Sequence, residues 1–331
     1  MSAPVAVIRI VVAVALLGLV AYLAAIGVEA SHQLVNQHYR VPECRLPAHV
    51  GLEYEPINYD VSGDAALLEE PDPWTCSREG APAGRELLTE DGVPIAGWYI
   101  PGADGLPADG PTVILAHGWT GNKSGQLDEA LLFHDGFNAV LFDFRNHGQS
   151  GDAATTQGIH EQRDLGAIVD WLVRDKGPET IVIWGQSMGG HTAVNVVADD
   201  PRVDALILDS THAEVTGPMA RRIEEQRPLG GPGALTAVLG TFVRTGVNVM
   251  ADDPLHAIDD LGTRPVLVLA GGSDSTIPPT EAERMVARAR AAGVDVRLEV
   301  CEPAGHAGLL EACPDDYGTW LEDFLAPFAA R

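Results

Sequence analysis

Six short apolar runs that alternate with helical patterns are the feature that most restricts the fold of this chain. The runs cover residues 112–116, 138–142, 180–184, 205–208, 265–270 and 294–300. Apolar residues with helical spacing follow at 162–174, 190–198, 280–292 and 317–328. Strands that alternate with helices form parallel sheets, and continuous apolar strands suit a sheet that is covered on both faces. We therefore predict an α/β fold with a mainly parallel sheet flanked by helices.

A hairpin is predicted at one edge of this sheet. Residues 85–89 and 94–99 are joined by Glu90-Asp91-Gly92, a short connection that is typical of two antiparallel strands. These two strands bring the predicted sheet to eight. Residues 85–331 are accordingly predicted to form the main domain.

The connection between residues 210 and 263 is too long for a single helix. It holds about fifty residues, with Gly230-Gly231-Pro232-Gly233 between two helix-like stretches at 218–226 and 234–243. Insertions of this length in a compact domain are usually functional or disordered. We predict a helical cap over a pocket, inserted at about residues 211–262.

The N-terminus differs in composition from the rest of the chain. Residues 10–28 carry no charge and are almost all Val, Ala, Leu and Ile, a run long enough to cross a bilayer as one helix. Arg9 precedes the run and Glu29 follows it, which favours an N-terminus in the cytoplasm and a main domain outside. Residues 1–30 are thus predicted to be a single-pass anchor in the cell membrane. A cleaved signal peptide, which would make the protein secreted, stays an alternative, as does a domain that faces the cytoplasm.

Residues 31–84 contain several prolines and two of the four cysteines. We predict a membrane-proximal stalk and an extension that packs on the main domain. An even number of cysteines outside the cytoplasm permits two disulfides. The pairs that lie near each other in sequence are Cys44–Cys76 and Cys301–Cys313, and the second pair would bracket His306. Free buried thiols remain the alternative.

Charge and ligand spacing exclude several classes of function. The formal net charge is −26, which argues against a nucleic-acid surface and disfavours docking of the folded domain onto anionic lipid. The chain contains no H-E-x-x-H or C-x-x-C spacing. We predict neither a metal nor a cofactor.

The strongest chemical signal is a serine between a strand and a helix. The segment Gly185-Gln186-Ser187-Met188-Gly189 follows the apolar run at 180–184 and opens the helical pattern at 190–198. This is the context of a nucleophile elbow, in which glycines permit a tight turn that lifts the serine out of the sheet. Ser187 is the predicted nucleophile.

A serine nucleophile needs a base and an acid that orients it. Asp274 follows the run at 265–270, and His306 follows the run at 294–300, so both sit where parallel sheets assemble their sites. The chain order Ser, Asp, His is the one that this architecture requires. Asp209 is an alternative acid, and the other histidines near strand ends or the elbow are weaker candidates for the base: His117, His147, His191 and His212.

An oxyanion hole requires two backbone N–H donors. One is predicted at Met188, directly after the nucleophile, and the other at Trp119 in the loop after the run at 112–116. His117 and Gly118 are predicted to support that loop. The indole of Trp119 would then line an acyl pocket, although a core aromatic is the alternative reading.

Four segments together resemble motifs of the α/β-hydrolase superfamily. The most similar group is that of capped bacterial esterases, monoacylglycerol-lipase-like and serine-aminopeptidase-like proteins, and the resemblance covers roughly residues 85–330. It implies an α/β-hydrolase fold with a mainly parallel eight-stranded sheet and a helical cap, and a D-x-R-x-H-G-x-S segment that supports the oxyanion loop. Gln186 departs from the pattern, since many members have His there. The segments are His117-Gly118-Trp119, Asp143-Phe144-Arg145-Asn146-His147-Gly148-Gln149-Ser150, Gly185-Gln186-Ser187-Met188-Gly189-Gly190 and Gly272-Ser273-Asp274.

The sequence therefore predicts a serine hydrolase that cleaves carboxylic esters through an acyl-enzyme. Its expected partners are a small-molecule ester or acyl substrate and, through the N-terminal helix, a membrane. A peptidase or amidase on the same triad is an alternative, for which Glu224 and Glu225 would bind a peptide amine. Thioesterase or acyltransferase chemistry is another, because other acceptors compete with water for one acyl-enzyme. A non-catalytic binding protein is disfavoured by the intact triad.

Overall fold

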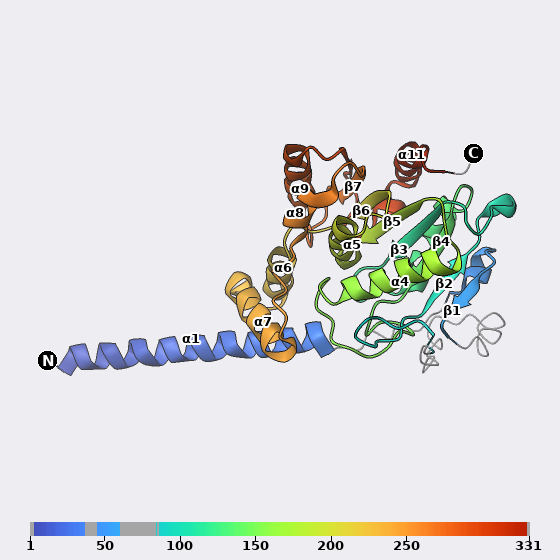
Figure 1. The fold of residues 1–331 in the computed structure, drawn as a ribbon. Helices are drawn as coiled ribbons and strands as arrows, with labels where there is room; N and C mark the ends of the chain where they lie inside the picture. Colours follow the sequence, from blue (N-terminus) through green and yellow to red (C-terminus); the bar gives the residue numbers. More distant parts are fainter. Residues whose placement is uncertain (1–2, 37–44, 60–83, 85, 330–331) are drawn as a thin grey trace.

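One eight-stranded sheet forms the centre of the molecule (Figure 1). The structure is a computed structural model that describes residues 3–36, 45–59, 84 and 86–329. The strand order is β1-β2-β4-β3-β5-β6-β7-β8; the last six run parallel, and β1 and β2 add antiparallel at one edge. The predicted eight-stranded, mainly parallel sheet is confirmed. The strands are β1 Glu55–Ile57, β2 Gly97–Ile100, β3 Thr112–Ala116, β4 Asn138–Phe142, β5 Ile181–Gln186, β6 Ala205–Asp209, β7 Val266–Gly271 and β8 Val296–Cys301.

Helices cover both faces of the sheet, which is why the parallel strands could be read as continuous apolar runs. In α4 the buried side chains Leu165, Ile168, Val169 and Leu172 recur at helical spacing and pack on the sheet. The helices α5 and α9 share that face, whereas α3 and α11 bury their apolar residues on the other. These helices are α3 Leu127–Phe133, α4 Glu161–Asp175, α5 Met188–Asp199, α9 Pro279–Ala292 and α11 Pro314–Leu325.

The predicted hairpin at the sheet edge is wrong in its first arm. Within the described residues 86–96, the two arms meet in a single bridge between Leu88 and Pro94; residue 85 lies outside the described part. The predicted turn itself forms, because the N–H of Thr89 donates to Val93 at 2.9 Å and the N–H of Ile95 donates to Leu87 at 3.1 Å. Pro94 has no N–H with which to extend the ladder. The second arm becomes β2, and β1 takes the edge position.

The cap consists of two helices, α6 Thr216–Gln226 and α7 Gly230–Thr245. They stand outside the sheet and its covering helices, joined to β6 and β7 (Figure 1). The predicted helix-like stretches at 218–226 and 234–243 fall within them. The remaining short helices are α8 Pro254–Ala257, α10 Leu309–Ala312, and the 3₁₀ turns η1 Pro47–Val50, η3 Ala103–Gly105, η4 Lys123–Gln126 and η5 Ile258–Leu261.

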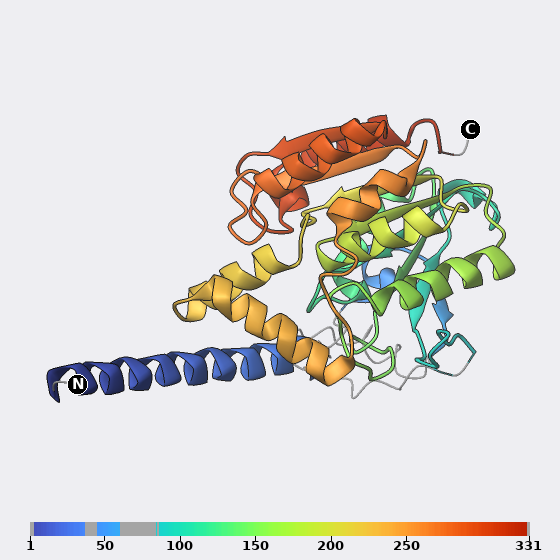
Figure 2. The same ribbon diagram turned by 60° about the vertical axis from the view of Figure 1, so that its left-hand side comes forward.

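The N-terminal helix α1, Ala3–Asn36, is longer than the predicted anchor. Val7–Asn36 is long and apolar enough to cross a membrane, and α1 is the one helix of the described residues for which this holds. No proline or glycine interrupts the chain between Val28 and Asn36, and Leu34 and Val35 are buried, so the helix continues past residue 30. Figure 2 shows α1 extending from the domain with α7 lying across it.

The segment predicted as a stalk contributes to the domain itself. Its described part contains the last turns of α1, η1 and the edge strand β1. Three residues in a strand are too few to show a periodic pattern, which explains why β1 escaped the sequence analysis. The predicted Cys44–Cys76 pair lies outside the described residues.

Candidate active site

Ser187 lies at the turn between β5 and α5, as the sequence predicts. Its backbone has φ 54° and ψ −114°, a conformation that is strained for a residue with a side chain and typical of functional sites. The turn depends on glycine: a Cβ on Gly189 would lie 2.0 Å from the carbonyl oxygen of Ala116, and a Cβ on Gly185 would lie 2.7 Å from Gly190. The strand and helix can therefore approach closely enough to present Ser187 at the surface of the pocket.

Asp274 and His306 meet at the carboxyl ends of β7 and β8. The Nδ1 of His306 lies 2.8 Å from Oδ2 of Asp274. The other carboxylate oxygen accepts hydrogen bonds from the backbone N–H groups of Thr276 and Ile277, at 2.8 and 2.7 Å. Asp274 is buried and fixed at both oxygens, so it can orient the imidazole, which is partly exposed toward the pocket.

Asp209, the alternative acid, is engaged elsewhere. Its carboxylate accepts hydrogen bonds from the hydroxyl groups of Tyr317 and Ser210, both at 2.8 Å. Burial raises the pKa of Asp209 to about 6. The contact with the imidazole of His306 is made by Asp274, and the geometry therefore favours Asp274 as its partner.

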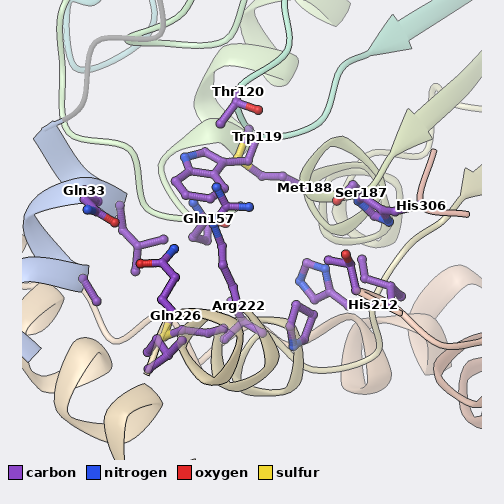
Figure 3. Close-up of a pocket in the computed structure, with 18 of the residues that line it drawn as sticks. Gln33, Trp119, Thr120, Gln157, Ser187, Met188, His212, Arg222, Gln226 and His306 are labelled. Carbon is purple, nitrogen blue, oxygen red and sulfur yellow. The ribbon is translucent and has the colours of Figure 1, made fainter. Parts of the chain in front are cut away.

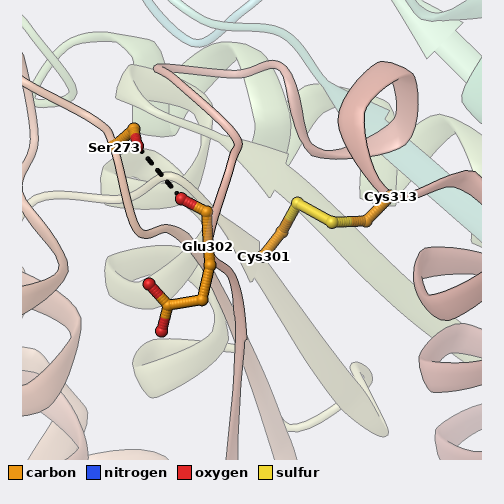
Figure 4. The surroundings of a disulfide bond; sticks show 4 residues. All are labelled: Ser273, Cys301, Glu302 and Cys313. Carbon is orange, nitrogen blue, oxygen red and sulfur yellow. Dashed lines mark hydrogen bonds between the residues drawn. A yellow bond between two sulfur atoms is a disulfide. The ribbon is translucent and has the colours of Figure 1, made fainter.

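A disulfide between Cys301 and Cys313 brackets the histidine loop, as one of the two predicted pairings has it (Figure 4). The loop that carries Asp274 is bonded to the same region: Ser273 donates from Oγ to the carbonyl oxygen of Glu302 at 3.0 Å, and from its N–H to Ala304 at 3.0 Å. The two hydrogen bonds of Ser273 thus join the loop of Asp274 to the loop of His306, which the disulfide closes.

The loop after β3 passes close to Ser187. A Cβ on Gly118 would lie 3.3 Å from the Cβ of Ser187, so the backbone of Gly118 and Trp119 is close to the serine. Met188 begins α5, whose N-terminus favours negative charge at the reacting centre. Trp119 and Met188 both line the pocket, and their roles as oxyanion donors stay a prediction.

Two buried histidines hold this loop in place. His117 accepts a hydrogen bond at Nε2 from the N–H of Phe144, at 3.0 Å, so its Nδ1 carries the proton and donates to the carbonyl of Gly118, at 2.7 Å. His147 accepts at Nε2 from the N–H of Thr120, at 3.3 Å. Burial lowers the pKa of His117 to about 3 and also lowers that of His147, so both rings are neutral supports.

A buried ion pair lies behind the histidines. Nζ of Lys123 is 2.6 Å from Oδ2 of Asp143. Although burial opposes the ionised form, the charge of Lys123 holds the pKa of Asp143 below its usual range. The N–H of Lys123 also donates to Asp143, at 2.9 Å, which connects the chain after the oxyanion loop to the end of β4. Asp143 and His147 therefore touch the loop and not the pocket.

A pocket of about 210 Å³ joins the serine to the cap and to the N-terminal helix (Figure 3). Ser187, His306 and Trp119 line it together with residues that the sequence analysis did not identify. Arg222 lies in the cap helix α6, with its guanidinium carbon 4.9 Å from the centre of the Trp119 ring. Further lining residues are Ile26, Glu29, Ala30, Gln33, Leu34, Gln157, His212, Val215, Met219, Ile223, Gln226 and Arg227.

The contribution of α1 to the pocket is the least expected feature. A sequence signal exists only in retrospect: Glu29 and Gln33 follow the apolar run without a helix breaker, one turn apart on the same helix face. Nothing in one sequence indicates that this face would meet α6. Within the described residues, no group of three or more His, Cys, Asp or Glu side chains is placed to hold a metal ion.

Comparisons with known proteins agree with the fold. The family described as "alpha/beta hydrolase fold" matches residues 111–237. The uncharacterized protein Rv2307c of Mycobacterium tuberculosis is 31% identical over 239 residues, which are 68% of this chain and 73% of that protein. Protein bem46 of Schizosaccharomyces pombe is 27% identical over 62% of this chain and 68% of its own length.

Among solved structures, the esterase Pf2001 of Pyrococcus furiosus superposes with a TM-score of 0.68 and 23% identity. The match covers 90% of this chain and 99% of the esterase, so it includes more than the sheet and its helices. The family match, the identity to the mycobacterial protein and the architecture give one answer: the chain belongs to the α/β-hydrolase superfamily.

Proposed function

We propose that the protein is a serine hydrolase that cleaves carboxylic esters, with Ser187 as nucleophile, His306 as general base and Asp274 as the orienting acid. The observation that carries the proposal is the 2.8 Å contact between His306 and Asp274 beside a serine in a strained elbow, all at one end of a parallel sheet. Structural cores seldom need strain, a buried carboxylate and a half-exposed imidazole at one point.

The proposed reaction runs through an acyl-enzyme. With Nδ1 directed to Asp274, the Nε2 of His306 takes the proton of Ser187 as its oxygen attacks the ester carbonyl. The N–H groups of Met188 and Trp119 stabilise the oxyanion. His306 then protonates the leaving alcohol, which departs and leaves an acyl-enzyme. In the second half His306 takes a proton from water as its oxygen attacks the acyl group, and returns a proton to Ser187 as the acid product leaves.

The pocket favours an acyl ester over a peptide. Its apolar walls come from α1 and α6, which suits an acyl chain. Glu224, considered for a peptide amine, accepts a hydrogen bond from the N–H of Gly230 at the start of α7, and neither it nor Glu225 is among the described lining residues. Glu29 does line the pocket but is paired with Arg227, at 2.8 Å. Thioester hydrolysis and acyl transfer would pass through the same acyl-enzyme and stay as alternatives.

We further propose that α1 is an uncleaved membrane anchor and that the catalytic domain lies outside the cytoplasm. The disulfide Cys301–Cys313 supports an oxidising compartment. Cleavage after Ala30 would remove Ile26 and Glu29 from the pocket wall, so secretion after cleavage is disfavoured.

The test is hydrolysis of p-nitrophenyl esters from acetyl to palmitoyl by the full chain in mild detergent. We expect turnover that Ser187→Ala reduces to background, by more than about 10⁴-fold, because without the nucleophile only the rest of the site remains. Thr263→Ala, which removes an exposed hydroxyl outside the pocket, is the matched control and should keep full activity. Turnover in Ser187→Ala above a few per cent of the wild-type rate would refute the assignment.

A further inference from the structure

The cap helix α7 carries an apolar face that no part of the described chain covers. Leu235 and Leu239 are each 61% exposed, Phe242 is 50% exposed and Val243 is 77% exposed. Their spacing places all four on one side of the helix. On the other side Ala234, Ala237 and Thr241 are buried. A contiguous exposed apolar stripe of this kind marks a surface that binds something apolar.

Helix α7 crosses α1 at the point where the apolar run of α1 ends, through residues other than the four exposed ones. The two helices touch through backbone: a Cβ on Gly27 would lie 2.6 Å from the carbonyl oxygen of Thr236 (Figures 1 and 2). One turn further along α1, Ser31 accepts a hydrogen bond at its hydroxyl from Arg244 of α7, at 3.0 Å. Because charge returns to α1 at Glu29, α7 crosses α1 at the level where an anchor leaves the hydrocarbon of a bilayer.

The pocket extends to the same level. Ile26, Ala30 and Leu34 of α1 line it, so the helix that would enter the membrane is also a wall of the site. Figure 3 shows Ser187 and His306 on one side of the pocket and Gln33 and Gln226 on the opposite side, toward α1 and the end of α6. The serine is therefore connected, through one cavity, with the membrane-proximal end of the cap.

We propose that the exposed face of α7 lies in the surface of the bilayer and that the pocket receives acyl esters of membrane lipids directly from it. Helices with one apolar face bind in this way, buried to a depth of about 5–10 Å at the boundary of headgroups and acyl chains. The inference rests on the proposed esterase and its anchor and narrows the substrate class to lipid acyl esters. With a net charge of −26, the chain would make this contact through apolar burial and not through anionic headgroups.

The experiment compares two substrates on the same full-length protein in phosphatidylcholine vesicles. One is a fluorogenic long-chain glycerol ester in the bilayer, and the other is water-soluble p-nitrophenyl acetate. The double variant Leu239→Asp with Phe242→Asp should hydrolyse the lipid ester at least tenfold more slowly and keep its acetate rate. The matched control is Leu131→Asp with Val173→Asp, two exposed apolar residues on α3 and α4, which should keep both rates.

A second measurement reports bilayer contact without turnover. In Phe242→Trp, brominated phosphatidylcholine should quench fluorescence beyond the wild-type level, whereas Val173→Trp should add no quenching.

Equal lipid-ester rates in wild type and the α7 double variant, or no added quenching in Phe242→Trp, would overturn the proposal. Loss of both activities in the α7 double variant would also overturn it. A changed oligomeric state of that variant with an unchanged lipid-ester rate would assign the face to a second copy of the chain. If wild type hydrolyses neither ester but the quenching appears, the esterase proposal fails and the membrane contact stands.

Discussion

At the scale of single residues, the site depends on backbone close to Ser187. The φ of 54° at the serine and the close passage of Gly118 leave little space around the nucleophile. The sequence predicted Ser187, Asp274 and His306 and their approach, because each follows a strand whose end is fixed by topology. It could not predict Arg222, Gln157 or Gln33 in the pocket, because they come from helices and loops whose placement depends on packing.

Gly118→Ala tests the closeness of the oxyanion loop. The added Cβ would lie 3.3 Å from the Cβ of Ser187 and must displace one of the two. We expect kcat for p-nitrophenyl butyrate to fall by roughly tenfold with little change in Tm, since a displacement of about 1 Å costs about 100-fold and relief of this contact needs only part of that. Gly166→Ala on α4, where a Cβ meets no atom within 4 Å, should retain activity. Equal rates for the two variants would contradict the geometry.

The buried histidine of the loop predicts a pH dependence of stability. The folded-state pKa of His117 is about 3, below the ordinary value of 6.5, so the unfolded chain binds more protons between these values. The stabilising contribution of His117 is present above pH 6.5 and is lost as the pH falls toward 3. The Tm difference between wild type and His117→Gln should therefore shrink from pH 7.5 to pH 4.5. Leu325→Ala, a core variant in the cluster on the other face of the sheet that removes no titrating group, should show a constant difference.

At the scale of elements, agreement was best where the pattern was local and repeated. The runs at 112–116 and 138–142 match β3 and β4 residue for residue, because buried parallel strands are apolar throughout. The first arm of the hairpin does not become a strand of the sheet, because Pro94 interrupts its pairing and β1 takes the edge position beside β2. The end of α1 was missed because its last turns are stabilised by contacts with the cap, which no local pattern contains.

The disulfide is expected to stabilise the loop that carries His306. It closes a loop of 12 residues around His306, and cross-links of this size contribute about 3 kcal/mol. Cys301→Ala with Cys313→Ser should lower the free energy of unfolding by about 2–4 kcal/mol, measured by denaturant titration. Reducing agent should destabilise wild type more than this variant, which keeps only Cys44 and Cys76. A midpoint equal to that of wild type would contradict a bonded pair.

The crossing of α1 and α7 should control the pocket. Gly27→Val places a branched side chain where even a Cβ would lie 2.6 Å from Thr236, so α1 must move away from the cap. We expect kcat/KM for long-chain esters to fall at least tenfold, with acetate affected less because it occupies only the part beside Ser187. Gly231→Val, on α7 with no atom near its Cβ position, is the control. An equal loss for acetate and long-chain esters would argue against α1 as an acyl wall.

At the scale of the whole molecule, three segments distant in sequence make one site. The strand ends of the sheet carry Ser187, Asp274 and His306, the cap supplies α6 and Arg222, and the N-terminal helix lines the pocket between them. An assay on residues 31–331 alone would therefore examine an altered pocket. The sequence patterns predicted an anchor and an α/β domain, but only the structure shows that residues of both line one pocket.

Covalent labelling tests whether Ser187 is an activated nucleophile, as we propose. The full-length protein is treated with a fluorophosphonate, digested and analysed by mass spectrometry. We expect one adduct, on the peptide that contains Ser187, formed at least 100-fold more slowly in His306→Ala and absent in Ser187→Ala. A folded protein that stays unlabelled, or that is labelled on another residue at the same rate in His306→Ala, would contradict it.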